Sequence, residues 1–202
     1  MGTVSDIPLR IPVTEETRAI QPHLEAKSMA LVSRLKAGDR SAATELVAAY
    51  YRQIYWFMRR LGHSREVSED LTQETFFQAW YKIEQLRSDG SFKPWLYRIA
   101  GNIAKGYAKK YGHKFEIGVE EIDEPLQDES GTQRIEDEEV LEELNQDISR
   151  LSVKLKEAIV LHYLQNLTIA EAAEAAGIRQ GTLKSRLNRA LSILRKRLDK
   201  HD

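Results

Sequence analysis

Apolar residues that recur at intervals of three and four positions are the feature that most restricts the fold of this chain. The clearest run lies in residues 41–61, where Leu46, Tyr50, Ile54 and Phe57 would share one stripe of a helix. Comparable runs lie in residues 27–37, 65–84, 94–112, 153–165, 168–176 and 179–198. No segment shows a convincing alternation at the period of two that a strand requires. The spacing therefore predicts an all-α fold.

Charged side chains divide the sequence into three parts. Residues 1–115 hold 18 basic and 12 acidic side chains, residues 116–149 hold 1 basic and 14 acidic, and residues 150–202 hold 11 basic and 5 acidic. The formal net charge of −1 thus hides two blocks of net +6 around a connector of net −13. We expect two small helical domains, over 27–115 and 150–202, joined by a flexible acidic linker over 116–149.

Residues 1–26 contain three prolines and no helical period, so we expect a mostly disordered extension there. The N-terminus lacks the basic and apolar regions of a secretory signal, and no apolar run approaches the ~20 residues of a membrane span. The chain has no cysteine, which excludes disulfides and thiolate metal sites. The five histidines show no metal-ligand spacing, and there is no glycine-rich phosphate loop. We expect a cytoplasmic protein with no membrane contact of its own, no metal or cofactor, and no enzymatic activity.

The last block has the pattern of a helix-turn-helix. Thr168 and Glu171 have the spacing of a capping box, and Gly177 allows the left-handed turn that would end the short helix. Leu183 would plug the core between the two helices of the motif. The other interpretation is an amphipathic C-terminal helix whose basic face is merely solvated.

The final helix carries side chains suited to reading DNA. Lysine and arginine read guanine edges in the major groove, asparagine reads adenine, and serine reads either base. Arg195, Lys196 and Arg197 would neutralise phosphates. The predicted outward face, which would read base edges, consists of Thr182, Lys184, Ser185, Asn188 and Arg189.

Four motifs, in order, resemble the extracytoplasmic-function (ECF) sigma factors of bacteria, over roughly residues 29–198. They are LKAGDRSAATELVAAYYRQIYWFMRRLG, EDLTQETFFQAW, SFKPWLYRIAGNIAKGYAKK and LTIAEAAEAAGIRQGTLKSRLNRALSILRKRL. The resemblance implies a non-enzymatic protein that binds core RNA polymerase, directs it to a promoter, opens the −10 region and is itself held by an anti-sigma factor. It also implies that 27–115 is sigma region 2 and that 150–202 is sigma region 4, whose helix-turn-helix would read the −35 element.

The motif EDLTQETFFQAW would leave a polar face with one exposed aromatic, made by Asp70, Gln73, Glu74 and Phe77. From the residues alone, an ordinary solvated helix face with a stray phenylalanine is equally consistent with this pattern. An aromatic among carboxylates also suits a protein interface. The resemblance implies that this face docks on the clamp of the largest polymerase subunit.

The third motif mixes aromatic and basic residues, which suits single-stranded DNA. Trp95 and Tyr97 diverge on a helix, and we expect Trp95 to be the one in the core. The resemblance implies that melted −10 DNA meets the preceding loop and the helix. The residues expected to take part are Ser91, Phe92, Lys93, Arg98, Asn102, Lys105 and Lys109.

Two other functions remain open on the sequence. A stand-alone helix-turn-helix regulator would bind DNA but would not need the polar face in residues 69–80. A sigma mimic would bind an anti-sigma factor in place of DNA, but it would be expected to have lost the basic residues Lys184 and Arg189.

Overall fold

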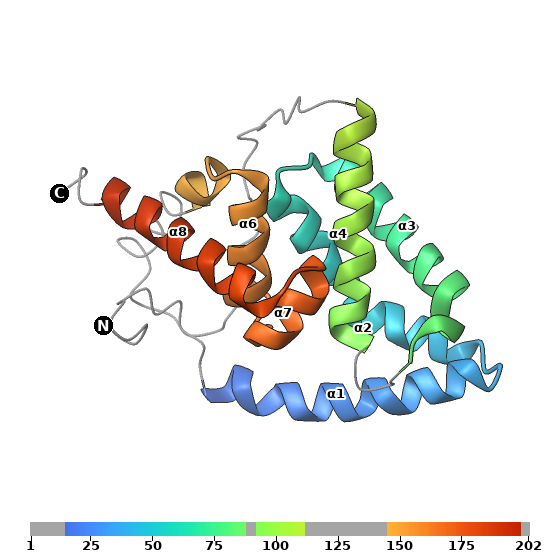
Figure 1. The fold of residues 1–202 in the computed structure, drawn as a ribbon. Coiled ribbons are helices and arrows are strands. Elements are labelled where there is room, and N and C mark those ends of the chain that lie inside the picture. The colour runs from blue at the N-terminus through green and yellow to red at the C-terminus, as the bar shows by residue number, and fades with distance from the viewer. Residues whose placement is uncertain (1–14, 88–91, 112–144, 199–202) are drawn as a thin grey trace, which may run out of the picture.

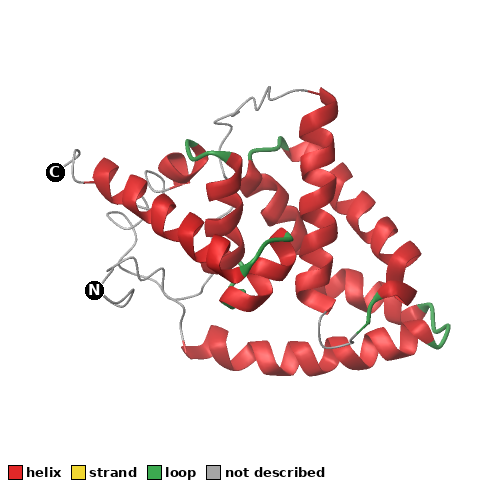
Figure 2. Cartoon of the chain, viewed as in Figure 1, coloured by secondary structure: helices red, strands yellow, loops and turns green. Residues whose placement is uncertain are grey.

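The computed structural model describes residues 15–87, 92–111 and 145–198, and each regular element in these ranges is a helix, as predicted (Figures 1 and 2). None of these helices is long and apolar enough to cross a membrane. The elements are α1 (Glu15–Lys36), α2 (Ser41–Leu61), α3 (Arg65–Lys82) with a 3₁₀ turn (Ile83–Gln85), α4 (Phe92–Tyr111), α6 (Val153–Ile159) with a π-helical turn (Val160–Leu164), α7 (Ile169–Ala176) and α8 (Gln180–Leu198).

Helices α1 to α4 form the first domain around α2, which packs against the other three. The predicted stripe of α2 is its buried side, with Leu46, Tyr50, Ile54 and Phe57 all fully buried. Gly62 ends the helix in the left-handed conformation (φ 103°), where a residue without a Cβ meets no steric penalty. The register of α2 therefore follows directly from the apolar spacing.

Helices α6, α7 and α8 form the second domain, in which α8 packs against both of the others. Residues 145–149 are also helical, and Ile148 is buried with this domain's core. The core side of α8 consists of Leu183, Leu187, Ala190, Leu191 and Leu194.

The expectation of a disordered extension over 1–26 was wrong for residues 15–26, which are the first turns of α1. Pro22 lies inside this helix, although proline removes one backbone hydrogen bond there. Helix growth is cooperative, since each added residue gains a hydrogen bond on an existing turn. The turns after Lys27 therefore extend backwards past the proline. Residues 1–14, and nearly all of the predicted linker, lie outside the described residues.

The two domains are packed against each other. Helix α7 of the second domain lies alongside α4 of the first, and α6 and the turn after it contact α2 (Figure 1). Nothing in the local sequence pattern indicated this contact.

Candidate nucleic-acid and protein interfaces

The helix-turn-helix is built as the sequence predicts. The Thr168 hydroxyl accepts from the Glu171 backbone N–H (3.3 Å), and the Glu171 carboxylate accepts from the Thr168 N–H (2.8 Å). Gly177 ends α7 with φ 68°. The four alanines of α7 that are buried have small side chains, which let α8 approach closely; they are Ala172, Ala173, Ala175 and Ala176. A short, tightly held turn thus presents α8 at a defined angle.

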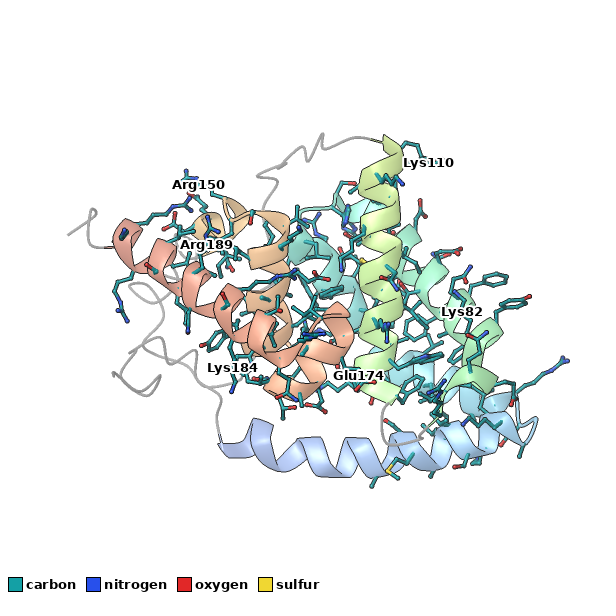
Figure 3. All side chains as sticks on the ribbon, in the orientation of Figure 1. Lys82, Lys110, Arg150, Glu174, Lys184 and Arg189 are labelled. Carbon is teal, nitrogen blue, oxygen red and sulfur yellow. The ribbon has the colours of Figure 1, made fainter. Side chains whose placement is uncertain are left out.

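The predicted reading face of α8 is exposed. Its turns bury Leu183 and Leu187, and the opposite side faces solvent. With 3.6 residues per turn, Lys184 and Arg189 flank this exposed face and Asn188 lies between them (Figure 3). All five predicted residues are exposed: Thr182, Lys184, Ser185, Asn188 and Arg189.

The end of α8 differs from the expectation. Arg197 donates to the backbone oxygen of Asp147 at 2.9 Å and lies 3.4 Å from its carboxylate. Asp147 is buried, and Arg150 also approaches it at 3.6 Å. Arg197 therefore ties α8 to residues 145–149, and it would have to leave Asp147 to contact a phosphate. Arg195 and Lys196 remain exposed.

The predicted polar face of α3 is also exposed. Asp70, Gln73 and Glu74 face solvent, and Phe77 is 65% exposed. Buried Thr72 and Thr75 sit on the opposite side, where their hydroxyls donate to carbonyl oxygens one turn earlier.

Tyr81 extends this face. It lies four residues after Phe77, is 80% exposed, and so is displayed on the same side of α3. Sequence reasoning missed it, although a second aromatic at that spacing was a readable signal. The α3 face is hereafter Asp70, Gln73, Glu74, Phe77 and Tyr81.

The residues expected to meet −10 DNA separate into three groups. Phe92 is 1% exposed and packs edge-on against Tyr50, with ring centroids 5.4 Å apart, so its prediction as a DNA contact was wrong for this structure. The Phe92 ring stabilises the fold more when it is buried in the core than it would if it were exposed to solvent. Ser91 lies outside the described residues, and Lys93 is half-buried. The exposed members on α4 are Arg98, Asn102, Lys105 and Lys109.

The expectation that Trp95 would be in the core in preference to Tyr97 was also wrong. Tyr97 is completely buried, whereas Trp95 is half-buried against the core. The Tyr97 hydroxyl donates to Gln165 Oε1 at 2.7 Å. Burial raises the pKa of Tyr97, which therefore stays a hydrogen-bond donor at neutral pH. The second domain provides this cover, so the periodicity of α4 alone could not predict it.

A second polar contact crosses between the domains. Lys105 Nζ on α4 lies 2.8 Å from Glu157 Oε1 on α6, and the Glu157 side chain is only 3% exposed. Its other oxygen, Oε2, is the one buried side-chain polar atom without a hydrogen-bond partner among the described residues. Burial lowers the pKa of the neighbouring Lys156. The pKa of His63 falls from 6.5 to about 4, first through burial and then through the charge of Lys156.

A cavity of about 520 Å³ lies beside this contact, with walls from both domains. Leu61, Ala104, Ala108 and Val153 provide its apolar lining, and Glu157 stands at its polar side.

Two family models match the sequence, Sigma-70 region 2 over residues 46–113 and Sigma-70, region 4 over residues 141–194. The chain is 30% identical over 188 residues to the ECF RNA polymerase sigma-E factor of Haemophilus influenzae, covering 84% of this chain and 94% of that protein. It is 31% identical over 176 residues to the ECF RNA polymerase sigma factor SigW of Bacillus subtilis, covering 83% and 94%. The chain belongs to the ECF sigma factors. It is an alternative sigma factor that directs transcription.

Solved structures share the fold of this ECF sigma factor. CnrH, determined in complex with the cytosolic domain of CnrY, has a TM-score of 0.66 at 22% identity, covering 87% of this chain and 99% of that one. The sigma factor RpoE of Bartonella quintana, determined with the anti-sigma factor NepR, has a TM-score of 0.61 at 23% identity, covering 77% and 96%. The region 2 match contains α3 and α4, and the region 4 match contains α6 and α7 with most of α8. In this sigma factor the two regions are therefore in direct contact through α4 and α7.

Proposed function

We propose that this sigma factor binds core RNA polymerase through the α3 face and brings it to promoters whose −10 and −35 elements are read by α4 and α8. The observation that carries this proposal is the division of α8. Its leucine side is buried, while all five residues predicted to read bases are exposed. A helix held by a capped turn and showing such a face fits a major groove.

The α3 face is the proposed polymerase interface, docking on the clamp of the largest subunit. Phe77 and Tyr81 lie one turn apart and expose most of their surface, with carboxylates on the preceding turns. Exposed aromatics of this kind are the usual anchors of protein interfaces. A DNA-binding regulator that never meets polymerase would have no use for them.

The exposed side of α4 is the proposed −10 interface. Arg98, Asn102 and Lys109 are accessible there, and Lys105 is added once it leaves Glu157. Lys93, in the first turn of the helix, would add to the site, while Phe92 supports it from the core. Ser91, which the sequence also suggests, lies outside the described residues. We propose that region 2 spans 27–115. Region 4 would begin before residue 150, because residues 145–149 pack with it.

Two further aspects extend the proposal. CnrH and RpoE were determined with the cytosolic domain of CnrY and with an anti-sigma factor, respectively, and we infer that an anti-sigma partner holds this chain too. We also infer that it works in the cytoplasm, where polymerase and promoter meet, by binding and without catalysis.

Run-off transcription with purified core polymerase on a genomic fragment library tests the function. Discrete transcripts that depend on the added protein are expected, and their upstream sequences report the promoter. DNA binding without transcripts or polymerase binding would indicate the stand-alone regulator. Binding to an anti-sigma factor with neither DNA nor polymerase binding would indicate the mimic.

A further inference from the structure

Helix α4 presents two adjacent rows of side chains to two different environments. Tyr97, Gly101 and Lys105 follow at intervals of four and lie along the side that meets the second domain. Arg98, Asn102 and Lys109 lie along the neighbouring, exposed side. Lys105 is the helical neighbour of both Asn102 and Lys109, so it stands at the border between the two rows.

Lys105 is held by a carboxylate where a DNA-bound helix would meet a phosphate. Its ammonium group lies 2.8 Å from Glu157 Oε1 although its side chain is nearly half exposed. The buried carboxylate of Glu157, which belongs to region 4, thus pairs with Lys105, the lysine at the border between the contact side and the exposed side of α4. A phosphate on the exposed side would have to share this ammonium group with Glu157, and the two anions would repel each other, so each weakens the other's contact with Lys105.

Glu157 is poorly satisfied in this position. Only one of its oxygens has a partner, and burying a carboxylate costs free energy that one ion pair offsets incompletely. When region 4 moves away, Glu157 regains water and Lys105 becomes available. The contact is therefore suited to exchange and not to permanent attachment.

Gly101 permits this approach. A Cβ at Gly101 would lie 3.1 Å from Glu157 Oε1, which is tighter than ordinary van der Waals contact. At Gly106, five residues later on the same helix, a Cβ would meet nothing within 4 Å. One glycine of α4 is thus tied to the interdomain contact and the other is not.

We propose that the Lys105–Glu157 ion pair is an autoinhibitory latch that holds region 4 against α4. The hydrogen bond between Tyr97 and Gln165 supports it, and binding to promoter and polymerase releases it by separating the two regions. This rests on the proposed function of α4 and α8. Elements roughly 25 base pairs apart lie about 80 Å apart along DNA, so regions in contact cannot read both. The 33 residues between Tyr111 and Asn145 reach about 110 Å when extended, which is enough for separation.

Energy transfer between two dyes measures the latch directly. Because the chain has no cysteine, Gln85→Cys and Ser192→Cys place one dye on each region at exposed positions. Gly101→Ala and Glu157→Gln should lower the transfer efficiency of the free protein. Each has a matched control that should not, namely Gly106→Ala on the same helix and Glu174→Gln at an exposed acid of α7 (Figure 3).

Promoter DNA binding without polymerase provides the second readout. Glu157→Gln should bind labelled promoter DNA about 5-fold more tightly than the parent, the size of effect expected for one ion pair. The exchanged pair Lys105→Glu with Glu157→Lys should restore high transfer efficiency without the gain in DNA affinity. If Gly101→Ala and Glu157→Gln match their controls in transfer efficiency, there is no latch. The proposed function fails separately, by the absence of polymerase-dependent transcripts.

Discussion

Arg197 in the last turns of α8 donates to the backbone oxygen of Asp147, 50 residues earlier in the chain and 2.9 Å away. The same guanidinium lies 3.4 Å from the Asp147 carboxylate, which is nearly inaccessible to solvent. The end of α8 is therefore fastened to residues 145–149, which pack with region 4. The basic cluster at the end of α8 contains one structural arginine beside two exposed cations.

Arg197→Ala should destabilise region 4 and leave the salt dependence of DNA binding unchanged. Loss of this charged donor leaves buried Asp147 with a weaker set of partners, and should lower the free energy of unfolding by about 1–3 kcal/mol. Urea denaturation followed by circular dichroism measures the change, with exposed Arg195→Ala as the control. A normal stability with a salt slope reduced by about 1 would instead place Arg197 on a phosphate.

Arg189→Ala should change which promoters are used without changing polymerase binding. A bidentate arginine–guanine contact discriminates between bases by about 1–3 kcal/mol, so cognate transcription should fall roughly 5- to 150-fold. Selection on randomised −35 sequences should show relaxed preference at one position. Arg179→Ala, at an exposed arginine before α8, is the control. Parental base preferences in Arg189→Ala would mean that α8 is not the reader.

Phe77→Ala and Tyr81→Ala should each weaken binding to core polymerase, because both rings are exposed one turn apart on α3. A loss of 2 kcal/mol or more, about 30-fold in the dissociation constant, is typical of an aromatic anchor. Asp70→Lys should also weaken binding. Helical content should not change in any of them, and Met29→Ala, on α1, controls for the loss of an exposed apolar side chain. Unchanged affinity in both aromatic variants would remove α3 from the interface.

Acid should destabilise the parent more than His63→Phe. The pKa of His63 is about 4 in the folded protein and 6.5 when unperturbed, chiefly because the ring is buried. Between these values the unfolded chain binds a proton that the folded chain does not. Stability is therefore lost as pH falls through this window, by up to about 3 kcal/mol from this group.

Phenylalanine keeps a ring against Tyr107, whose centroid lies 5.5 Å from that of His63, but it cannot be protonated. Thermal unfolding of both proteins from pH 7.5 to 4.5 checks this prediction, and the curve of the variant should be flatter. The difference at pH 7.5 measures the cost of the substitution that does not depend on protonation of His63. Parallel curves would show that His63 protonates as readily when folded as when unfolded.

Features set by neighbouring residues were readable from the sequence. The Thr168–Glu171 cap and the Gly177 turn depend on groups within four positions, and the stripe through Leu46 and Tyr50 follows from helix geometry. The exposed face of α8 was predictable for the same reason, because the side of the helix opposite its buried leucines must face solvent.

Features set by distant partners were not readable. Tyr97 is buried because Gln165, 68 residues later, belongs to a domain that covers it. Lys105 looks like any exposed lysine until Glu157 is placed beside it. Phe92 follows a polar stretch of sequence and begins a basic helix, and only its contact with Tyr50 reveals a core residue. Such pairings depend on tertiary structure, which a single sequence does not display.

If the proposed latch operates, the size of the side chain at position 101 sets how readily this sigma factor responds. In the free protein, a larger side chain at this position would increase the fraction of molecules whose two regions are separated. Tighter contacts around Glu157 would decrease that fraction. Neither change alters the exposed residues of α8 that we propose read the promoter. A substitution at Gly101 would therefore change how easily this sigma factor engages its promoters without changing which promoters they are.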